Sequence, residues 1–411
     1  MALTVLQGGN VLDLTQGVLL ENHHVVIENE RIVEVSDRPL AFPEARVLDV
    51  AGKTVMPGLI DCHVHVLAAS ANLGLNALQP NTLTTIRALP ILRAMLERGF
   101  TTVRDAGGAD WGLARAVQMG LVPGPRIFPS GKALSQTGGH GDFRPRGDFL
   151  EPCSCCFRAG AIARVVDGVE GVRLAVREEL QKGATQIKIM ASGGVASPND
   201  PIGNTQYSLE EIQAIVAEAR AAQTYVMAHA YTPRAIERAV CCGVRTIEHG
   251  NLVDEATAIF MHTQGAFVVP TLVTYDALAT HGAVLGLPPE SLAKIEEVRA
   301  AGRASLEIYA RAGVPMGFGS DLLGEMHHLQ GEEFRIRAEV VGNLNALRSA
   351  TSVAAEILQC GAELGVVAAG ALADLLVIDG DPLQDIELLA GSGERIEYVL
   401  QRGRLVKGRR H

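Results

Sequence analysis

Short apolar runs alternate with segments of helical periodicity through the middle of the chain. The apolar runs do not carry a polar residue at every second position, which is typical of strands that are buried on both faces in a parallel sheet. Gly and Pro residues punctuate their ends. We expect a strand in each of eight segments: 56–66, 101–105, 126–130, 186–190, 225–230, 245–248, 266–270 and 315–320.

Polar residues mark the starts of the helices between these strands. Ser208 with Glu211 three positions later forms a capping box, which predicts a helix over residues 209–222. Thr232 followed by Pro233 supplies the N-cap and the first residue of the next helix. Repeated strand–helix units therefore predict an α/β fold with a parallel sheet.

Eight such units favour a closed (β/α)8 TIM barrel over residues 57–365. A doubly wound sheet is the competing architecture. That architecture favours a glycine fingerprint after the first strand, whereas Pro57 and Gly58 precede the apolar run here.

Both ends of the chain show short alternating segments separated by Gly, Asn and Asp, which is typical of a small antiparallel sheet. Neither end is large enough to form a core of its own. We therefore expect residues 1–56 and 366–411 to pair into one small β domain beside the barrel.

The composition narrows the class of partner. The chain has 411 residues, 47% of them hydrophobic, and a formal net charge of -10. An acidic chain argues against a nucleic-acid or anionic-membrane surface and favours a small-molecule substrate. The sequence shows no secretory signal and no apolar run of about 18 residues, so we expect a cytoplasmic protein with no membrane span.

The seven cysteines are spaced in a way that suits neither simple disulfides nor a zinc site. We expect free thiols. A structural zinc at residues 153–156 is the alternative, but it lacks a second Cys or His pair at a workable spacing.

Candidate metal ligands stand at the ends of the predicted strands. His63 and His65 lie two residues apart on one strand, so both side chains project from the same face. In a barrel the site is built at the carboxyl ends of the strands. The polar residues at these ends are His63, His65, Asp105, Lys188, His229, His249 and Asp321.

Lys188 is flanked by aliphatic residues in a strand that reads as buried. Burial favours the neutral amine, which can add CO2 to become a carbamate that bridges two cations. The alternative is a lysine paired with an acid such as Asp105 or Asp321. Likewise His229 and His249 could be hydrogen-bonded core histidines, and Asp321 a helix cap. Their joint placement at one rim favours two first-row divalent ions, with zinc as the expected metal.

These residues resemble, in order and strand position, the metal ligands of the amidohydrolase superfamily. The resemblance extends to residues 27–33 and 55–61 near the start and to 370–374 and 405–408 near the end. It implies a β-sandwich built from the two terminal segments. It also implies that His63, His65 and Asp321 hold one metal, that His229 and His249 hold the other, and that carbamylated Lys188 and a hydroxide bridge them.

Within the superfamily the chain is most similar to the zinc dipeptidases called prolidases, and more distantly to imidazolonepropionase. The similarity rests on residues 135–142, 188–194 and 229–231. It implies hydrolysis of a dipeptide or N-acyl amino acid, with Xaa-Pro as the expected type. Asp321 would shuttle the proton, and His140 and Tyr231 would contact the substrate. Arg144 and Arg146 could attract a carboxylate, although exposed arginines are commoner.

Several rival functions use the same barrel. A lactone, carbamate or cyclic-amide hydrolase would need the same two-metal centre. A deaminase generally uses one metal, a Glu near the fifth strand and no lysine ligand, and Lys188 argues against it. A metal-free scaffold would have no reason to keep all six ligands. The resemblance also leads us to expect a homo-oligomer, although no sequence feature fixes the number of subunits.

Overall fold

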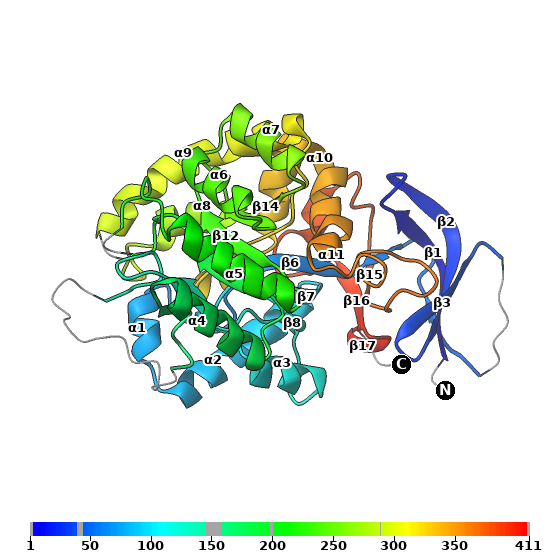
Figure 1. Cartoon of the computed structure of the whole chain (residues 1–411). Coiled ribbons are helices and arrows are strands. Elements are labelled where there is room, and N and C mark those ends of the chain that lie inside the picture. The colour runs from blue at the N-terminus through cyan, green and yellow to red at the C-terminus, as the bar shows by residue number, and fades with distance from the viewer. Residues whose placement is uncertain (1–2, 39–43, 145–157, 198–199, 288, 409–411) are drawn as a thin grey trace.

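Parallel strands surrounded by helices lie beside a sheet that contains strands from both ends of the chain (Figure 1). The computed structural model describes residues 3–38, 44–144, 158–197, 200–287 and 289–408. Within these ranges, no helix combines the length and the apolar character that crossing a membrane requires. The described cysteines, Cys62, Cys241, Cys242 and Cys360, are free thiols. The zinc alternative at 153–156 lies outside the described residues.

The parallel strands form two ladders. One has the order β6–β7–β8 and the other β10–β9–β11–β12–β13–β14. Seven of the eight predicted segments contain one of these strands, which confirms the parallel α/β prediction. Their bounds are β6 Leu59–Val64, β7 Phe100–Asp105, β8 Arg126–Phe128, β9 Ala133–Ser135, β10 Ala163–Val165, β11 Ile187–Met190, β12 Val226–Ala230, β13 Thr246–His249 and β14 Phe267–Val269.

The prediction of a regular strand over residues 315–320 is wrong, because the structure assigns only an isolated bridge between Met316 and Val268 there. The backbone groups of this segment bond to three different partners: Gly317 N–H donates to Val268 O, Phe318 O accepts from Cys62 N–H, and Phe318 N–H donates to Ser349 O. Such divided pairing does not form a regular ladder. The two ladders are not continuous, so the closed barrel stays a prediction.

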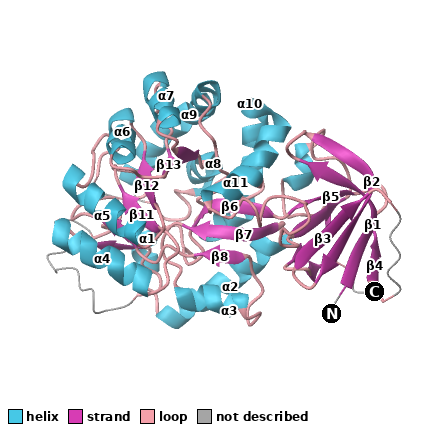
Figure 2. Ribbon diagram, turned by 45° about the vertical axis from the view of Figure 1, so that its right-hand side comes forward, coloured by secondary structure: helices cyan, strands magenta, loops and turns pink. Residues whose placement is uncertain are grey.

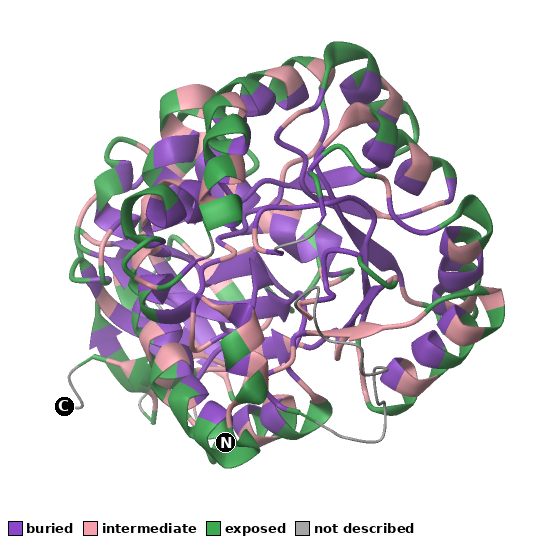
Figure 3. Cartoon of the chain, turned by 90° about the vertical axis from the view of Figure 1, so that its left-hand side faces the viewer, coloured by how far each residue is buried: buried purple, intermediate pink, exposed green. Residues whose placement is uncertain are grey.

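Helices cover the outer side of these strands (Figure 2). Buried residues gather on the strands and on the inward faces of the helices, and exposed residues on the outer faces (Figure 3). The two predicted helix starts are confirmed, since α5 has the Ser208 capping box and α6 has Thr232 as N-cap. The helices are α1 Leu73–Leu78, α2 Asn81–Glu97, α3 Trp111–Gln118, α4 Val169–Gln181, α5 Leu209–Ala221, α6 Pro233–Cys241, α7 Glu255–Thr263, α8 Leu272–His281, α9 Pro289–Ala312, η1 Gly324–Leu329, α10 Glu332–Ser349, α11 Ser352–Ile357 and η2 Ile386–Leu389.

The two ends of the chain share one eight-stranded sheet, in which C-terminal β15 pairs with N-terminal β5. The sheet is mixed, because β1 runs parallel to β4 and β5, so the prediction of a purely antiparallel sheet is wrong. Alternating burial predicts which face of a strand is covered, but not the direction of its neighbour. A two-layer sandwich stays a prediction. The strands are β1 Leu3–Asp13, β2 Val18–Glu28, β3 Arg31–Ser36, β4 Arg46–Asp49, β5 Thr54–Pro57, β15 Leu375–Ile378, β16 Ile396–Gln401 and β17 Arg404–Lys407.

Gly58 is the junction between the terminal sheet and the parallel strands. The predicted strand over 56–66 divides there into β5, which belongs to the terminal sheet, and β6, which belongs to the parallel ladder. A Cβ atom at Gly58 would lie 2.2 Å from Thr101 Oγ1, so no larger residue fits at this crossing without a shift. The Gly58 N–H donates to Asp374 O at 2.8 Å, which ties the junction to the C-terminal segment.

Candidate metal centre

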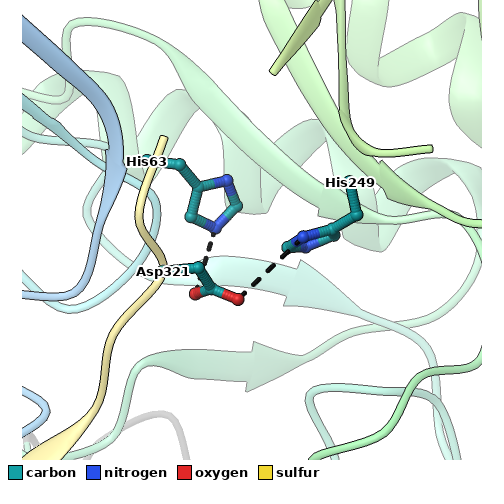
Figure 4. Close-up of side chains that lie close together, drawn as sticks. All are labelled: His63, His249 and Asp321. Atoms are coloured by element: carbon teal, nitrogen blue, oxygen red, sulfur yellow. Dashed lines mark ion pairs between the residues drawn. The ribbon is translucent and has the colours of Figure 1, made fainter. Parts of the chain in front are cut away.

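The structure brings the predicted ligands from separate strand ends around one carboxylate (Figure 4). Asp321 Oδ1 lies 3.4 Å from His63 Nε2 and 3.3 Å from His65 Nε2, and Asp321 Oδ2 lies 4.0 Å from His249 Nδ1. Ligand atoms of His63, His249 and Asp321 all lie within 4.8 Å of one another. This spacing suits residues that could share a metal ion.

The remaining predicted ligands border the same pocket. The ring centroid of His249 is 4.6 Å from that of His229 and 4.8 Å from that of His63. Lys188 lines the pocket beside these rings. The six predicted ligands His63, His65, Lys188, His229, His249 and Asp321 therefore face one cavity.

Each of the four imidazoles uses one ring nitrogen for a protein contact. Nδ1 of His63 is 2.7 Å from Glu248 Oε2, and Nδ1 of His65 is 2.9 Å from Gly107 O. Nδ1 of His249 is 2.7 Å from Thr271 Oγ1, whereas His229 uses Nε2, 3.1 Å from Gly193 O. In the tautomers in which these nitrogens donate, the opposite nitrogen of every ring is left unprotonated, as a metal ligand requires.

The protonation states of several predicted ligands also suit the binding of a cation. Burial alone would raise the pKa of Asp321, but its contacts with His63, His65 and His249 hold that pKa well below the usual range. Burial and neighbouring groups such as Lys188 lower the pKa values of His229 and His249 well below the ordinary value. An ionised carboxylate and neutral imidazoles are the forms that bind divalent metals, so Asp321, His229 and His249 fit the implied ions. Burial would lower the pKa of His65, but its contacts with Asp321 raise that pKa, so a cation would have to displace a proton there.

Lys188 is fully enclosed, and burial lowers its pKa to about 8. Within the described ranges it makes no hydrogen bond or ion pair, so the alternative of pairing with Asp105 or Asp321 is not observed. Asp105 instead accepts the backbone N–H of Val66, just after β6, and those of Gly107 and Ala109 in the loop after β7. The Lys188 amine is therefore available for other chemistry.

Glu248 and Arg104 form a buried pair beside the predicted ligand His63 that the sequence analysis missed. Both are 0% exposed, and Arg104 Nη2 lies 2.9 Å from Glu248 Oε1. Burial would raise the pKa of Glu248, but Arg104 and His63 hold it at about 2. A charged residue inside an apolar strand, next to the ligand His249, was the available signal.

Two of the predicted ligands have a left-handed backbone, with φ of 73° at His249 and 50° at Asp321. This region is uncommon for residues other than Gly, and such strain gathers at functional sites.

The predicted substrate contacts also reach the pocket. The His140 ring stacks on that of His229 with centroids 4.2 Å apart, and His140 Nδ1 is 2.7 Å from Ser197 Oγ. Tyr231 Oη lies 2.8 Å from the hydroxyl of Tyr275, a pocket residue that the sequence analysis missed.

Of the two arginines suggested for carboxylate binding, Arg144 is the one that the structure describes, and it does not line the pocket. Arg144 bonds to Asp142 through Nε at 2.7 Å and Nη2 at 2.6 Å, and it is not among the pocket-lining residues. Arg146 lies outside the described residues.

Comparisons with known proteins show the family of this chain. The sequence model of the amidohydrolase family matches residues 54–406. The chain is 31% identical to ochratoxinase of Aspergillus niger over 419 aligned positions, covering 95% of this chain and 86% of that protein. It is 76% identical to a prolidase solved with N-methylphosphonate-L-proline, with a TM-score of 0.98 and coverage of 99% and 100%. A Xaa-Pro dipeptidase solved with methionine in its active site is 28% identical, with a TM-score of 0.89 and coverage of 99% and 100%. The chain belongs to the amidohydrolase family and is a hydrolase acting on C–N bonds.

Proposed function

We propose that this protein cleaves the amide bond before the C-terminal residue of a dipeptide or N-acyl amino acid, with proline as that residue, on a centre of two zinc ions. The observation that carries the proposal is the pocket that gathers four imidazoles, an ionised Asp321 and the buried amine of Lys188. The ligand count favours two ions over one.

The donor set suggests how the ligands are shared. His63 and His65 lie closest to Asp321 and would hold one ion with it, while His229 and His249 would hold the second. Lys188, as its carbamate, would bridge the two. Bound metal ions at such a site supply hydroxide at neutral pH and polarise the scissile carbonyl.

The protein's own residues would move the proton and hold the substrate. Asp321 is the acid–base group in this proposal, because its carboxylate stands between the ligand histidines and can pass a proton to the leaving nitrogen. The stacked His140 and the hydroxyl of Tyr231 lie at the pocket wall, where they would bind the carbonyl or the carboxylate of the substrate.

Two observations support proline as the C-terminal residue of the substrate. The prolidase that is 76% identical was solved with N-methylphosphonate-L-proline. A tetrahedral phosphonate on the proline nitrogen resembles the species formed when water attacks an acyl-proline amide, and enzymes bind such mimics tightly. In addition, the pocket wall is largely apolar, which suits the proline ring; its aliphatic residues are Leu73, Ile162, Met190, Val195, Ala196, Leu278 and Leu323.

We also propose that the two parallel ladders are parts of one (β/α)8 barrel over residues 57–365, with a β-sandwich from 1–56 and 366–411. Hydrogen bonds at the two places where one ladder would meet the other support this proposal. At one place Phe318 O accepts from Cys62 N–H at 2.7 Å, and at the other Thr185 N–H donates to Pro129 O at 2.8 Å.

A substrate panel tests the function. Zinc-loaded protein is assayed on Ala-Pro and N-acetyl-proline, on the matched Ala-Ala and N-acetyl-alanine, and on a lactone, a carbamate and a cyclic amide. We expect kcat/KM to be at least about a hundredfold higher for the proline compounds than for their matched partners. Turnover confined to the lactone, carbamate or cyclic amide would reject the dipeptidase assignment and favour the rival hydrolases.

A further inference from the structure

Helix α8 has a threonine at its N-cap position, but the side chain of that threonine does not cap the helix. Thr271 stands at the N-cap position of α8, yet its hydroxyl makes no bond to the first turn of that helix. By contrast, α6 and α7 are capped by the side chains of Thr232 and Asp254. The Thr271 hydroxyl is instead 2.7 Å from Nδ1 of His249, so it serves a proposed metal ligand.

A residue from another helix makes the missing bond. Glu333 of α10 accepts the N–H of Val273, in the first turn of α8, at 2.7 Å. An acceptor for one of the first N–H groups is what an N-cap provides. Glu333 is 0% exposed and does not line the pocket, so its contact with the site passes through the chain at the start of α8.

Arg337 holds the other side of the same segment. Its Nε lies 2.8 Å from Glu333 Oε1, and its Nη2 donates to Pro270 O at 2.6 Å. The two side chains of α10 thus hold the backbone on either side of Thr271, at Pro270 and at Val273. Buried ion pairs often contribute little net stability, so a positional role accounts better for this one.

We propose that Glu333 and Arg337 are positioning residues, in which Glu333 caps α8 in place of Thr271 and so leaves the Thr271 hydroxyl to orient His249. The inference rests on the metal centre proposed above. If the cap from Glu333 is removed, Thr271 can turn to its own helix, and His249 then loses the partner that fixes its tautomer. Metal binding should weaken, because such outer contacts are commonly worth 10- to 100-fold in affinity.

Zinc titration of the metal-free protein tests this with a readout other than activity. The variants are Thr271→Val, the double variant Glu333→Leu/Arg337→Met, which removes both buried charges together, and the triple variant. We expect the first two to weaken binding of one zinc equivalent by about 10- to 100-fold, and the triple variant to be no weaker than Thr271→Val. Glu339→Gln, at an exposed position of α10, is the matched control.

Several outcomes would overturn the inference. The inference fails if the double variant binds zinc with wild-type affinity. It also fails if the loss of zinc affinity in the triple variant is the product of the losses in Thr271→Val and in the double variant. Glu333→Gln keeps an oxygen that can accept from Val273 N–H, so we expect its affinity within about threefold of wild type, since replacing a capping acceptor by another costs little. A loss in Glu333→Gln as large as that of Thr271→Val would assign the effect to charge and not to the cap. Failure of the wild-type protein itself to bind zinc would instead reject the metal centre.

Discussion

The carboxylate of Glu248 lies 2.7 Å from Nδ1 of His63, while its other oxygen is 2.9 Å from Arg104 Nη2. Arg104 keeps Glu248 ionised, and an ionised carboxylate is the strongest acceptor for the imidazole N–H. This contact orients the His63 ring and leaves Nε2 facing Asp321, 3.4 Å away. The chain of contacts Arg104–Glu248–His63 therefore orients a predicted metal ligand.

Weakening the contact between Glu248 and His63 should weaken metal binding. In Glu248→Gln the acceptor loses its charge, and we expect the zinc dissociation constant to rise about 10- to 100-fold. Competition with a chromogenic chelator measures it, and Glu21→Gln, at an exposed position of β2, is the control. An unchanged constant in Glu248→Gln would show that Glu248 does not support His63.

Asp321→Asn should separate binding from turnover. The amide keeps an oxygen for the metal but cannot accept and return a proton, so we expect bound zinc to persist while kcat falls by about 10²- to 10⁴-fold. Metal analysis of the purified variant accompanies the assay. A variant with near wild-type kcat would remove Asp321 from the acid–base role.

Loading of the site should depend on bicarbonate and pH through Lys188. A pKa of about 8 leaves roughly a quarter of the amine neutral at pH 7.5, and the neutral form is the one that adds CO2. We expect zinc reconstitution of metal-free protein to be faster with bicarbonate, and slower at pH 6.5 than at pH 8.5. ¹³C NMR with labelled bicarbonate should show a carbamate signal that Lys188→Ala lacks. Equal reconstitution with and without bicarbonate would argue against the carbamate.

The position of the His140 ring should depend on the lack of a side chain at Gly194. A Cβ atom at Gly194 would lie 2.3 Å from His140 Cε1, so Gly194→Ala must displace the ring from His229. We expect kcat/KM for the proline substrate to fall by at least about tenfold, since misplaced groups in a site commonly cost that much or more. Gly203→Ala is the matched control, because a Cβ there meets nothing within 4 Å. Equal activity of the two variants would remove His140 from the substrate site.

The buried Glu333 should make stability depend on pH. Burial raises its pKa from 4.5 to about 7, against the opposing effect of Arg337. The folded protein then binds more protons than the unfolded chain between these values, so its stability falls as pH rises through that window. Relative to Glu333→Gln, metal-free wild type should lose up to about 3 kcal/mol of unfolding free energy between pH 4.5 and 7. Denaturant unfolding at pH 5, 6, 7 and 8 measures it; a constant difference between the two proteins would contradict the shift.

The sequence predicted those features that depend on local periodicity. Two histidines at a spacing of two must share a face of a strand, and ligands at the ends of parallel strands must converge on one rim. These rules placed His63, His65, His229 and His249 in one pocket. The start of α5 was likewise readable, since its capping box involves only neighbouring residues.

Features that depend on contacts across the fold could not be read in this way. Glu248 and Arg104 are 144 positions apart, and nothing local indicates that a charge in one strand pairs with a charge in another. A threonine before a helix normally caps it, whereas the Thr271 hydroxyl lies beside His249, a residue 22 positions away. Likewise, the apolar run over 315–320 matched a strand, but its backbone groups bond to three separate segments.

The crossing at Gly58 has a consequence for biosynthesis. The strand that leads into His63 is held through β5, which pairs with β15 near the far end of the chain. A nascent polypeptide therefore has β1, one partner of β5, but lacks β15, the other partner, until residues 375–378 have been made. We expect the pocket around His63 to bind metal only after β15 has been made, so that metal loading follows the synthesis of this strand.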